Sequence, residues 1–244
     1  MINGAVVTIV EILGRAVQGA TMPFRCRGDD GNIYFVKGRH AGRRAQICEW
    51  IGCTLAREFG LPVAPFAVVD VPEPLIAISP PAWRELGTGL AFGSAAIPFT
   101  LEFSLSNIEK VPLGLQQDLL AFDWWILNQD RQLTAFGGNP NLLWSARDTD
   151  VSVIDHNLAF DTAFDVEVFR SNHVFAAQWD TVYSDWIIRQ RIEQKCAQAH
   201  GSLDVAWDRM PDEWWWAGDG VPADIDRTFI ETTLARFTRP DFWG

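Results

Sequence analysis

The sequence predicts an α+β fold with two lobes, one rich in strands and one mostly helical. Short segments with strand-like patterns dominate residues 1–96, and among them only Arg43–Phe59 has the spacing of a long helix. Longer helical patterns dominate residues 97–244. Strands with one helix, followed mainly by helices, are typical of α+β architecture. With 244 residues, we expect an N-lobe over 1–96 and a C-lobe over 97–244 that together form one domain.

The predicted N-lobe consists of apolar or alternating segments separated by turn residues. Gly31 and Asn32 separate two of these segments and predict a hairpin. Arg43–Phe59 repeats apolar residues at every fourth position, and Gly60 follows it as a typical helix-ending glycine. Apart from one strand near its end, we expect residues 72–96 to be a loop. The predicted strands are 5–12, 22–28, 33–38, 66–71 and 89–95.

The predicted C-lobe has an apolar helix, a short hairpin and then three further helices. The first helix is dense in apolar residues and has Asp123 inside it. The hairpin pairs two short apolar segments, and a polar turn joins them. The predicted helices are 113–127, 180–199, 203–214 and 223–237, and the hairpin strands are 141–144 and 151–155.

Composition and charge exclude several classes of protein. The net charge is −11, and it is uneven. Residues 1–70 hold 8 basic and 6 acidic side chains, a balance of +2, whereas residues 71–244 hold 12 basic and 25 acidic, a balance of −13. Such an acidic larger part argues against non-specific nucleic-acid binding. The sequence shows no run of 18 uncharged apolar residues and no C-x-x-C pair, so we expect a reduced, cytoplasmic protein that does not enter membranes.

Lys37 and Glu49 are charged residues in weakly polar surroundings. Lys37 ends the apolar segment Ile33–Val36, where a lysine either guards a sheet edge or binds an anion. Glu49 lies on a helix face made mostly of small residues, and a buried carboxylate there needs a cation. Lys37 is the candidate partner. The alternative is that Glu49 lies on the polar, solvent-facing side of the helix.

The polar run Asn128–Arg131 directly follows the first C-lobe helix. Asp130 is a candidate catalytic base or hydroxyl-orienting residue. Arg131 is placed either to orient Asp130 or to bind an anion such as phosphate. An isolated aspartate in such a position is also common in turns, and that is the alternative.

Asn141 opens one strand of the predicted hairpin, and Asp155 ends the other. The hairpin therefore brings the two side chains to the same end of the ladder. Amide and carboxylate oxygens are suitable ligands for Mg²⁺, which rarely has an all-protein cage. Two turn residues flanking a hairpin are the alternative interpretation, and Asn139 is a rival to Asn141 for the metal position.

Gly14–Pro23 is a candidate phosphate-binding loop because it is rich in small residues. Gly19, Ala20 and Thr21 would let backbone N–H groups approach a phosphate. An ordinary hairpin turn explains the same residues about as well, since neither a GxGxxG nor a Walker A pattern is present.

Taken as a set, these segments resemble the HipA-like kinases and, more distantly, the phosphatidylinositol kinases. The resemblance covers roughly residues 15–165, and the C-terminal helices match only in general character. The sequence stretches that carry it are NIYFVKG, QICEWIGCTLAREFGLPVAPFAVV, FDWWILNQDR, NPNLL and VIDHNLAF.

The resemblance implies a protein-kinase-like fold that uses ATP and Mg²⁺. It places Lys37 on the ATP phosphates with Glu49 holding it, Asp130 as the base, and Asn141 and Asp155 on the metal. The chain departs from the family pattern in two ways. Asp130 and Asn141 are eleven positions apart, several more than usual, and Asn157 stands where the family has a glycine after Asp-His.

The resemblance also implies transfer of the γ-phosphoryl group to a Ser/Thr-type hydroxyl, with an acceptor that is either a protein or a small molecule. The chain is shorter than the full HipA toxins, in which an additional N-terminal region helps to engage an antitoxin. Our hypothesis is that a small partner protein supplies this surface in a toxin–antitoxin-like system. The alternative is a pseudokinase that binds nucleotide or acts as a scaffold.

Overall fold

The structure, a computed structural model, describes residues 6–16, 22–147 and 150–243 and divides into two compact units. Unit 1 comprises residues 1–50, 64–98 and 207–225. Unit 2 comprises residues 51–63, 99–206 and 226–244. Both units are discontinuous in sequence, because the chain passes between them several times.

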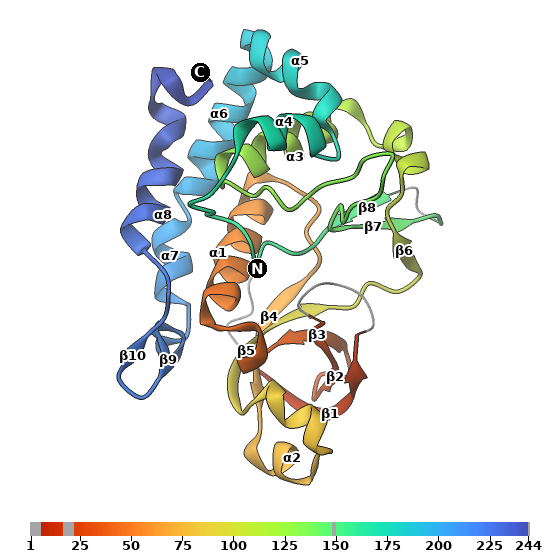
Figure 1. Ribbon diagram of the computed structural model, residues 1–244, viewed down its shortest axis with the longest axis vertical. Helices are drawn as coiled ribbons and strands as arrows, with labels where there is room; N and C mark the ends of the chain where they lie inside the picture. Colours follow the sequence, from red (N-terminus) through yellow and green to blue (C-terminus); the bar gives the residue numbers. More distant parts are fainter. Residues whose placement is uncertain (1–5, 17–21, 148–149, 244) are drawn as a thin grey trace. The chain divides into compact units, whose positions relative to one another are not determined.

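Unit 1 contains a closed β-barrel (Figure 1). Its strands follow the order β1-β2-β3-β5-β4, and β1 closes the barrel by pairing in parallel with β4. The other pairs are antiparallel. The sequence predicted each of these strands to within a few residues. The strands are β1 Val7–Arg15, β2 Phe24–Gly28, β3 Ile33–Lys37, β4 Phe66–Val71 and β5 Gly89–Ala95.

Alternation of side chains explains how these strands form the barrel. In β2, Phe24 and Cys26 are buried while Arg25 and Arg27 are exposed, as expected for a strand with one face on a core. The turn between β2 and β3 uses Gly31, whose φ of 83° suits a glycine. The buried residues of the barrel form one hydrophobic cluster that includes Ile9, Phe24, Val36, Val69 and Ala91.

Helix α1 covers Arg43–Phe59, the range that the sequence predicts. It ends at Gly60, which has a φ of 91°, and the N–H of Leu61 donates to the carbonyl oxygen of Ala56. The first part of α1 belongs to unit 1 and the part from Ile51 onward belongs to unit 2.

Unit 1 also holds two short helical segments where the sequence predicted loop. They are α2, Glu73–Ile78, and a 3₁₀ turn over Pro81–Leu86. Each begins at prolines, which fit the first helical turn because its N–H groups have no intrahelical acceptor. Unit 1 also contains a two-stranded ribbon of β9 Trp216–Gly218 and β10 Val221–Pro222.

Unit 2 has a small antiparallel sheet in the order β6-β7-β8. Strands β7, Leu142–Ser145, and β8, Asp150–Val153, form the predicted hairpin. The sequence did not predict β6, Thr100–Glu102, because three residues are too few to show alternation.

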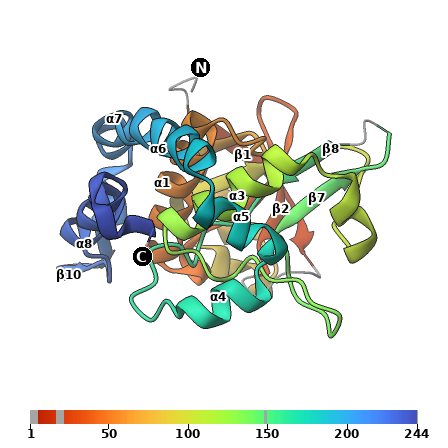
Figure 2. The same ribbon diagram turned by 90° about the horizontal axis from the view of Figure 1, so that it is seen from above.

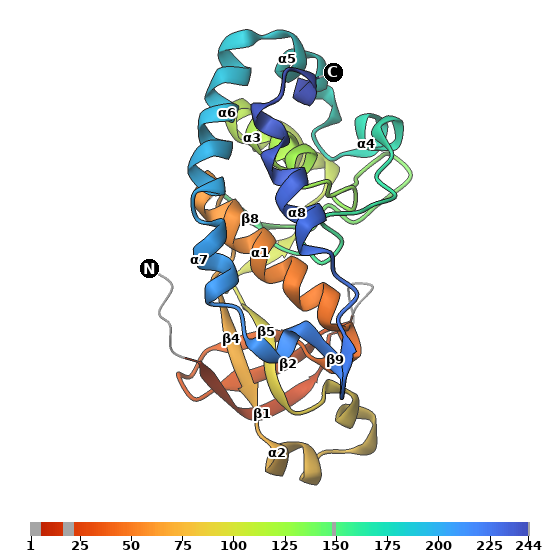
Figure 3. The same cartoon turned by 90° about the vertical axis from the view of Figure 1, so that its left-hand side faces the viewer.

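Helices make up most of unit 2, and α3, α5 and α6 lie side by side (Figure 2). Helix α8 lies beside α6 (Figure 3). Of the helices described in the structure, none is long and apolar enough to cross a membrane. The bounds are α3 Leu113–Trp125, α4 Val166–Asn172, α5 Trp179–Ser184, α6 Trp186–His200, α7 Leu203–Asp208 and α8 Arg227–Leu234.

Two capping residues and a proline account for the differences between three predicted helices and the observed ones. The expected helix 180–199 is broken into α5 and α6 because Asp185 has extended backbone and caps α6, accepting hydrogen bonds from the N–H groups of Ile187 and Ile188. Asp226 caps α8 in the same way, so this helix starts later than expected. The predicted helix 203–214 ends at Asp208, and a separate 3₁₀ turn begins after Pro211.

Candidate functional site

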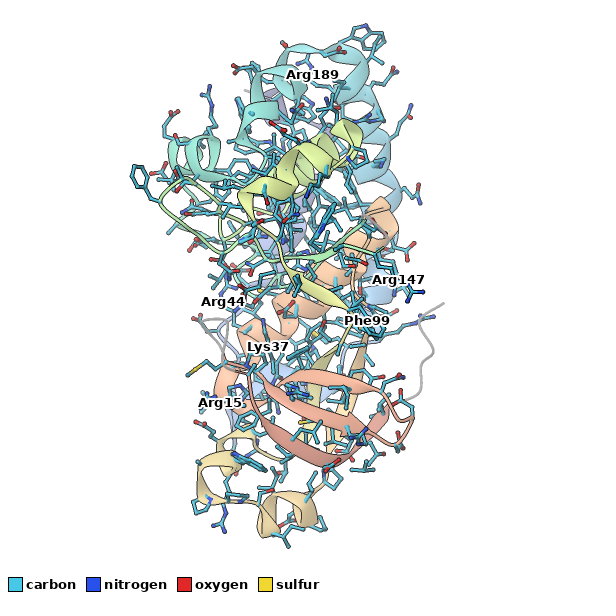
Figure 4. The ribbon with its side chains drawn as sticks, turned by 90° about the vertical axis from the view of Figure 1, so that its right-hand side faces the viewer. Arg15, Lys37, Arg44, Phe99, Arg147 and Arg189 are labelled. Carbon is cyan, nitrogen blue, oxygen red and sulfur yellow. The ribbon has the colours of Figure 1, made fainter. Side chains whose placement is uncertain are left out.

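Lys37 and Glu49 form a buried ion pair in unit 1 (Figure 4 labels Lys37). Lys37 is the last residue of β3, and Glu49 lies in the middle of α1. The Lys37 Nζ donates a hydrogen bond to the Glu49 carboxylate, and the two side chains are only 7% and 2% exposed. The side chain of Gln46, one turn earlier in α1, donates to the carbonyl oxygen of Lys37 at 2.9 Å. The predicted pairing is therefore present.

The surroundings of Glu49 distinguish it from Glu58, the other acidic residue in α1. The Glu58 side chain is 40% exposed and pairs with its neighbour Arg57 at 3.3 Å, as an ordinary surface carboxylate does. A charged carboxylate as buried as Glu49 is costly without a cation beside it. The helix thus fixes the position of the Lys37 ammonium group at the end of β3.

In unit 2, Asp130 and Asn141 meet although they are eleven positions apart. The Asn141 Nδ2 donates to the Asp130 Oδ2 at 2.8 Å. The intervening residues fold back on themselves, because the N–H of Gln132 donates to the carbonyl oxygen of Asn139 at 3.2 Å. The added length therefore forms a side loop and does not separate Asp130 from Asn141.

Asn141 and Asp155 lie at one end of the β7–β8 hairpin. Leu142 pairs with Val153, and the N–H of Ile154 donates to the Asn141 carbonyl oxygen at 3.1 Å. Both Asn141 and Asp155 have left-handed backbone, with φ of 50° and 59°. Such conformations are uncommon outside glycine and concentrate at functional sites.

The donor groups at this end of the hairpin are of the chemical type that a magnesium ion binds. The Asn141 amide and the Asp155 carboxylate supply hard oxygen ligands in the number that Mg²⁺ usually takes from a protein. Asn139 is exposed, and its side-chain oxygen accepts a hydrogen bond from the Asn141 N–H at 3.3 Å. These contacts favour Asn141 over Asn139 as the metal ligand.

Arg131 is fully buried, and its hydrogen bonds hold the backbone at Asn141 and next to Asp155. Its Nε donates to the Asp123 Oδ2 at 2.7 Å. Its Nη1 donates to the carbonyl oxygens of Asn141, at 2.6 Å, and Ile154, at 3.1 Å. The sequence left two roles open for Arg131, orienting Asp130 or binding phosphate. These contacts favour a positioning role, through the backbone at Asn141 and Ile154, over binding phosphate.

Sequence reasoning missed the polar network around Asp123. The His173 Nε2 lies 3.0 Å from the Asp123 Oδ2, and the Asn128 Nδ2 donates to Asp123 Oδ1 at 2.8 Å. His173 Nδ1 accepts from the N–H of Phe175, so its proton is on Nε2. The one signal in the sequence was an acidic residue inside an apolar helix.

The electrostatics of this network keep Asp123 charged. Burial raises the pKa of its carboxyl group, but the Arg131 charge and the hydrogen bonds from His173 and Arg131 outweigh this effect and lower the pKa to about 2. Burial lowers the pKa of His173, and the hydrogen bond to Asp123 opposes that shift only in part. A charged Asp123–Arg131 pair and a neutral His173 follow.

His156 attaches the Asp155 segment to the second part of α1. Its Nδ1 lies 3.4 Å from the Cys53 Sγ, and its ring packs edge-on against Phe122. Gly52 makes this approach possible, since a Cβ there would lie only 2.6 Å from the His156 Cβ. His156 therefore has a packing role next to a candidate metal ligand.

Half of the candidate phosphate loop, residues 17–21, lies outside the described residues, and this half includes Gly19, Ala20 and Thr21. At its edges, Gly14 has a φ of 129°, and the N–H of Ala16 donates to the carbonyl oxygen of Pro23 at 2.8 Å. The roles expected for the three residues remain predictions.

Solved structures show which fold the chain has. A Helicobacter pylori proinflammatory kinase, CtkA, is similar with a TM-score of 0.55 and 11% identity, covering 96% of this chain and 95% of that one. The Golgi casein kinase with Mn/ADP bound gives a TM-score of 0.43 and 13% identity over 95% of this chain and 71% of that one. The predicted protein-kinase-like fold is confirmed by the similarity to CtkA.

A comparison of the sequence with curated proteins gave no match. A comparison with models of protein families, in contrast, gave a match over nearly the whole chain. A family model described as HipA-like kinase matches residues 9–244. The chain belongs to the HipA-like kinases.

Proposed function

We propose that this chain is a cytoplasmic ATP-dependent kinase that transfers the γ-phosphoryl group of ATP to a Ser/Thr-type hydroxyl. The observation that carries the proposal is the 2.8 Å hydrogen bond between Asp130 and Asn141, next to Asp155 at the end of the hairpin. This hydrogen bond joins the candidate base to Asn141, which with Asp155 forms a pair of oxygen donors suited to Mg²⁺. Membership of the HipA-like kinases supports it.

Each residue has a distinct role in this proposal. Asp130 accepts the proton of the acceptor hydroxyl while the hydroxyl oxygen bonds to the γ-phosphorus and the bond to ADP breaks. Lys37, held by Glu49, neutralises the ATP phosphates. Asn141 and Asp155 would hold Mg²⁺, which when bound neutralises charge on the phosphates.

Arg131 acts indirectly, as a positioning residue. Its hydrogen bonds to the carbonyl oxygens of Asn141 and Ile154 fix the backbone beside both candidate metal ligands. Asp123 balances its charge in the interior. In this way the network holds the backbone of the site in place before ATP binds, a form of pre-organisation that favours phosphoryl transfer.

The test is incubation with labelled ATP and Mg²⁺, followed by mass spectrometry of the chain and of co-purifying proteins. In Asp130→Asn and Asp155→Asn we expect transfer to fall by about 10² or more, because the base or a metal ligand is lost. Asp204→Asn, which alters an exposed carboxylate on α7, is the matched control. Phosphoryl transfer at the wild-type rate in both site variants, with the fold intact by circular dichroism, would refute the proposal.

A pseudokinase that binds nucleotide or serves as a scaffold for a partner protein is the second candidate. The side loop inserted directly after Asp130 and the absence of a glycine-rich phosphate motif favour it. Mg²⁺-dependent ATP binding without transfer to any acceptor would support this candidate. Co-purification with a small, stoichiometric partner would support a toxin–antitoxin-like arrangement.

A further inference from the structure

A small cavity lies directly beside the candidate base in unit 2. Its volume is about 100 Å³, and its lining residues are Gln129, Asp130, Gln132, Leu158 and Asp161. An acceptor hydroxyl must reach Asp130 for phosphoryl transfer, so groups around this cavity are in position to contact the rest of the acceptor. The chemistry of the lining then indicates which acceptor fits.

Backbone hydrogen bonds hold Asp161 at the edge of this cavity. The N–H of Phe160 donates to the carbonyl oxygen of Ile126 at 2.8 Å, and the N–H of Asp161 donates to that of Leu127 at 3.3 Å. Phe160 and Leu127 both have left-handed backbone, with φ of 58° and 51°. The segment after the candidate metal ligand Asp155 is thus tied to the segment before Asp130, and Asp161 is fixed next to the base.

The lining is acidic and is held by hydrogen bonds. The Gln129 Oε1 accepts from the N–H of Asp165 at 2.6 Å, and the Gln132 Nε2 donates to the Gln129 carbonyl oxygen at 2.9 Å. The Asp161 Oδ1 accepts from the N–H of Ala163 at 2.8 Å. Two carboxylates and no cationic side chain are among the described lining residues. A cation adjacent to the acceptor hydroxyl would complement this charge.

An exposed aromatic side chain stands on the side loop that begins at this cavity. Phe136 is fully exposed. Its loop is nevertheless ordered by hydrogen bonds, since Thr134 and Gly137 exchange backbone bonds at 3.0 Å and the N–H of Leu133 donates to the Asn172 carbonyl oxygen at 3.1 Å. The ordered backbone reduces the entropy lost when this exposed ring contacts a partner.

We propose that the acceptor is a basic polypeptide segment. Its Ser or Thr hydroxyl lies at Asp130, a neighbouring Lys or Arg side chain pairs with Asp161, and an apolar residue packs on Phe136. The excess of acidic side chains in residues 71–244, 25 against 12 basic, adds a long-range attraction for such a segment. This inference rests on the proposed kinase function and narrows it to a substrate class.

The first experiment compares two serine peptides that differ only in having arginine or glutamate beside the serine. We expect wild-type kcat/KM to be at least about tenfold higher for the arginine peptide, as for one charged contact. Asp161→Asn keeps an oxygen for the Ala163 N–H, removes the charge, and should reduce this ratio several-fold. Glu109→Gln, which alters an exposed carboxylate elsewhere in unit 2, should keep the wild-type ratio.

The second experiment tests Phe136 with arginine peptides that carry leucine or serine at successive positions around the phosphorylated serine. We expect wild type to prefer leucine at one of these positions and Phe136→Ala to lose that preference. Trp186→Ala, which removes another exposed aromatic ring in unit 2, should retain it. Because each readout is a ratio between peptides, a general loss of activity does not imitate the result.

The outcomes separate this inference from the proposed function. Equal kcat/KM for the arginine and glutamate peptides, or a ratio unchanged in Asp161→Asn, would overturn the basic-acceptor proposal while leaving kinase activity established. Transfer to small hydroxyl compounds but to neither peptide would also overturn it. Failure to transfer phosphate from ATP to any acceptor would instead remove the proposed function, and the inference with it.

Discussion

Lys37 and Glu49 neutralise each other inside unit 1, and this allows stability and catalysis to be tested separately. Glu49→Met leaves a buried ammonium group without its carboxylate, and we expect it to lower the free energy of unfolding by about 3–5 kcal/mol. The double variant Lys37→Met/Glu49→Met replaces both charges by apolar groups and should recover most of that loss. Neither variant should transfer phosphate.

Urea unfolding and the phosphoryl-transfer assay together provide the measurement. A double variant as unstable as Glu49→Met would mean that Glu49 stabilises the protein through contacts other than the Lys37 ammonium group. Transfer activity in the double variant would show that Lys37 does not act on ATP.

His173 makes stability depend on pH, with a sign set by its buried, neutral state. Its folded pKa lies below the ordinary value of 6.5, so its contribution to stability is complete above that pH and is lost as pH falls. Asp123, whose pKa is lowered from 3.8 to about 2, loses its contribution only in stronger acid. We therefore expect His173 to dominate the acid destabilisation of this network above about pH 5.

The measurement is the free energy of urea unfolding at about pH 7.5 and pH 5.5. His173→Gln should show a smaller drop between the two values than wild type, because the titrating imidazole is gone. His200→Gln removes a histidine outside the network and serves as the control. A drop in His173→Gln as large as in wild type would contradict the assignment.

The sequence revealed candidate site residues where a polar residue interrupts a simple pattern. Two of them end apolar segments, namely Lys37 and Asp155. The third, Glu49, lies within a helix face of small residues. Asp123 gave such a signal inside its helix, but its partner His173 gave none, because the two residues are fifty positions apart and only the folded chain brings them together. Likewise, spacing alone left Asn139 and Asn141 as rivals, and it was hydrogen bonding that favoured Asn141.

At the scale of elements, the contact between α1 and His156 depends on one glycine. Replacing a helical glycine by alanine usually stabilises a protein by up to about 1 kcal/mol. At Gly52 the new Cβ would lie 2.6 Å from the His156 Cβ, so Gly52→Ala should instead destabilise the protein and displace Asp155. We expect lower phosphoryl transfer with a raised Mg²⁺ requirement.

Gly114 in α3 is the matched control for this substitution. A Cβ at Gly114 would have only the Arg191 Nη1 at 3.8 Å nearby, an ordinary contact. Gly114→Ala should therefore be neutral or slightly stabilising in urea unfolding and leave the Mg²⁺ requirement as in wild type. If Gly52→Ala behaves in the same way, His156 does not position Asp155 through α1.

Local patterns predicted the barrel strands and α1 well, because both are set by side-chain periodicity and a terminating glycine. The helices after residue 165 were predicted less well. Their ends depend on single capping side chains such as Asp185 and Asp226, and a periodicity argument does not weigh these. The prolines at the start of α2 led to the opposite error, since a helix starts there where a loop was expected.

At the scale of the whole molecule, ligand binding should appear as added stability. A ligand that binds only the folded state stabilises it by about 2.7 kcal/mol at a hundred times its Kd. For a chain of 244 residues this corresponds to a rise in Tm of roughly 5–10 °C. We expect ATP with Mg²⁺ to produce such a rise and ATP with EDTA to produce much less, because Asn141 and Asp155 hold ATP through the metal.

Two variants then distinguish binding from catalysis. Asp155→Asn should lose most of the Mg²⁺-dependent rise in Tm, because a metal ligand is weakened. Asp130→Asn should retain it, since we assign Asp130 to the acceptor proton and not to the metal. A rise in Tm that is the same with Mg²⁺ and with EDTA would exclude this metal site. A metal-dependent rise in wild type without phosphoryl transfer to any acceptor would identify the chain as a pseudokinase, because the same oxygen donors would then bind nucleotide without reacting.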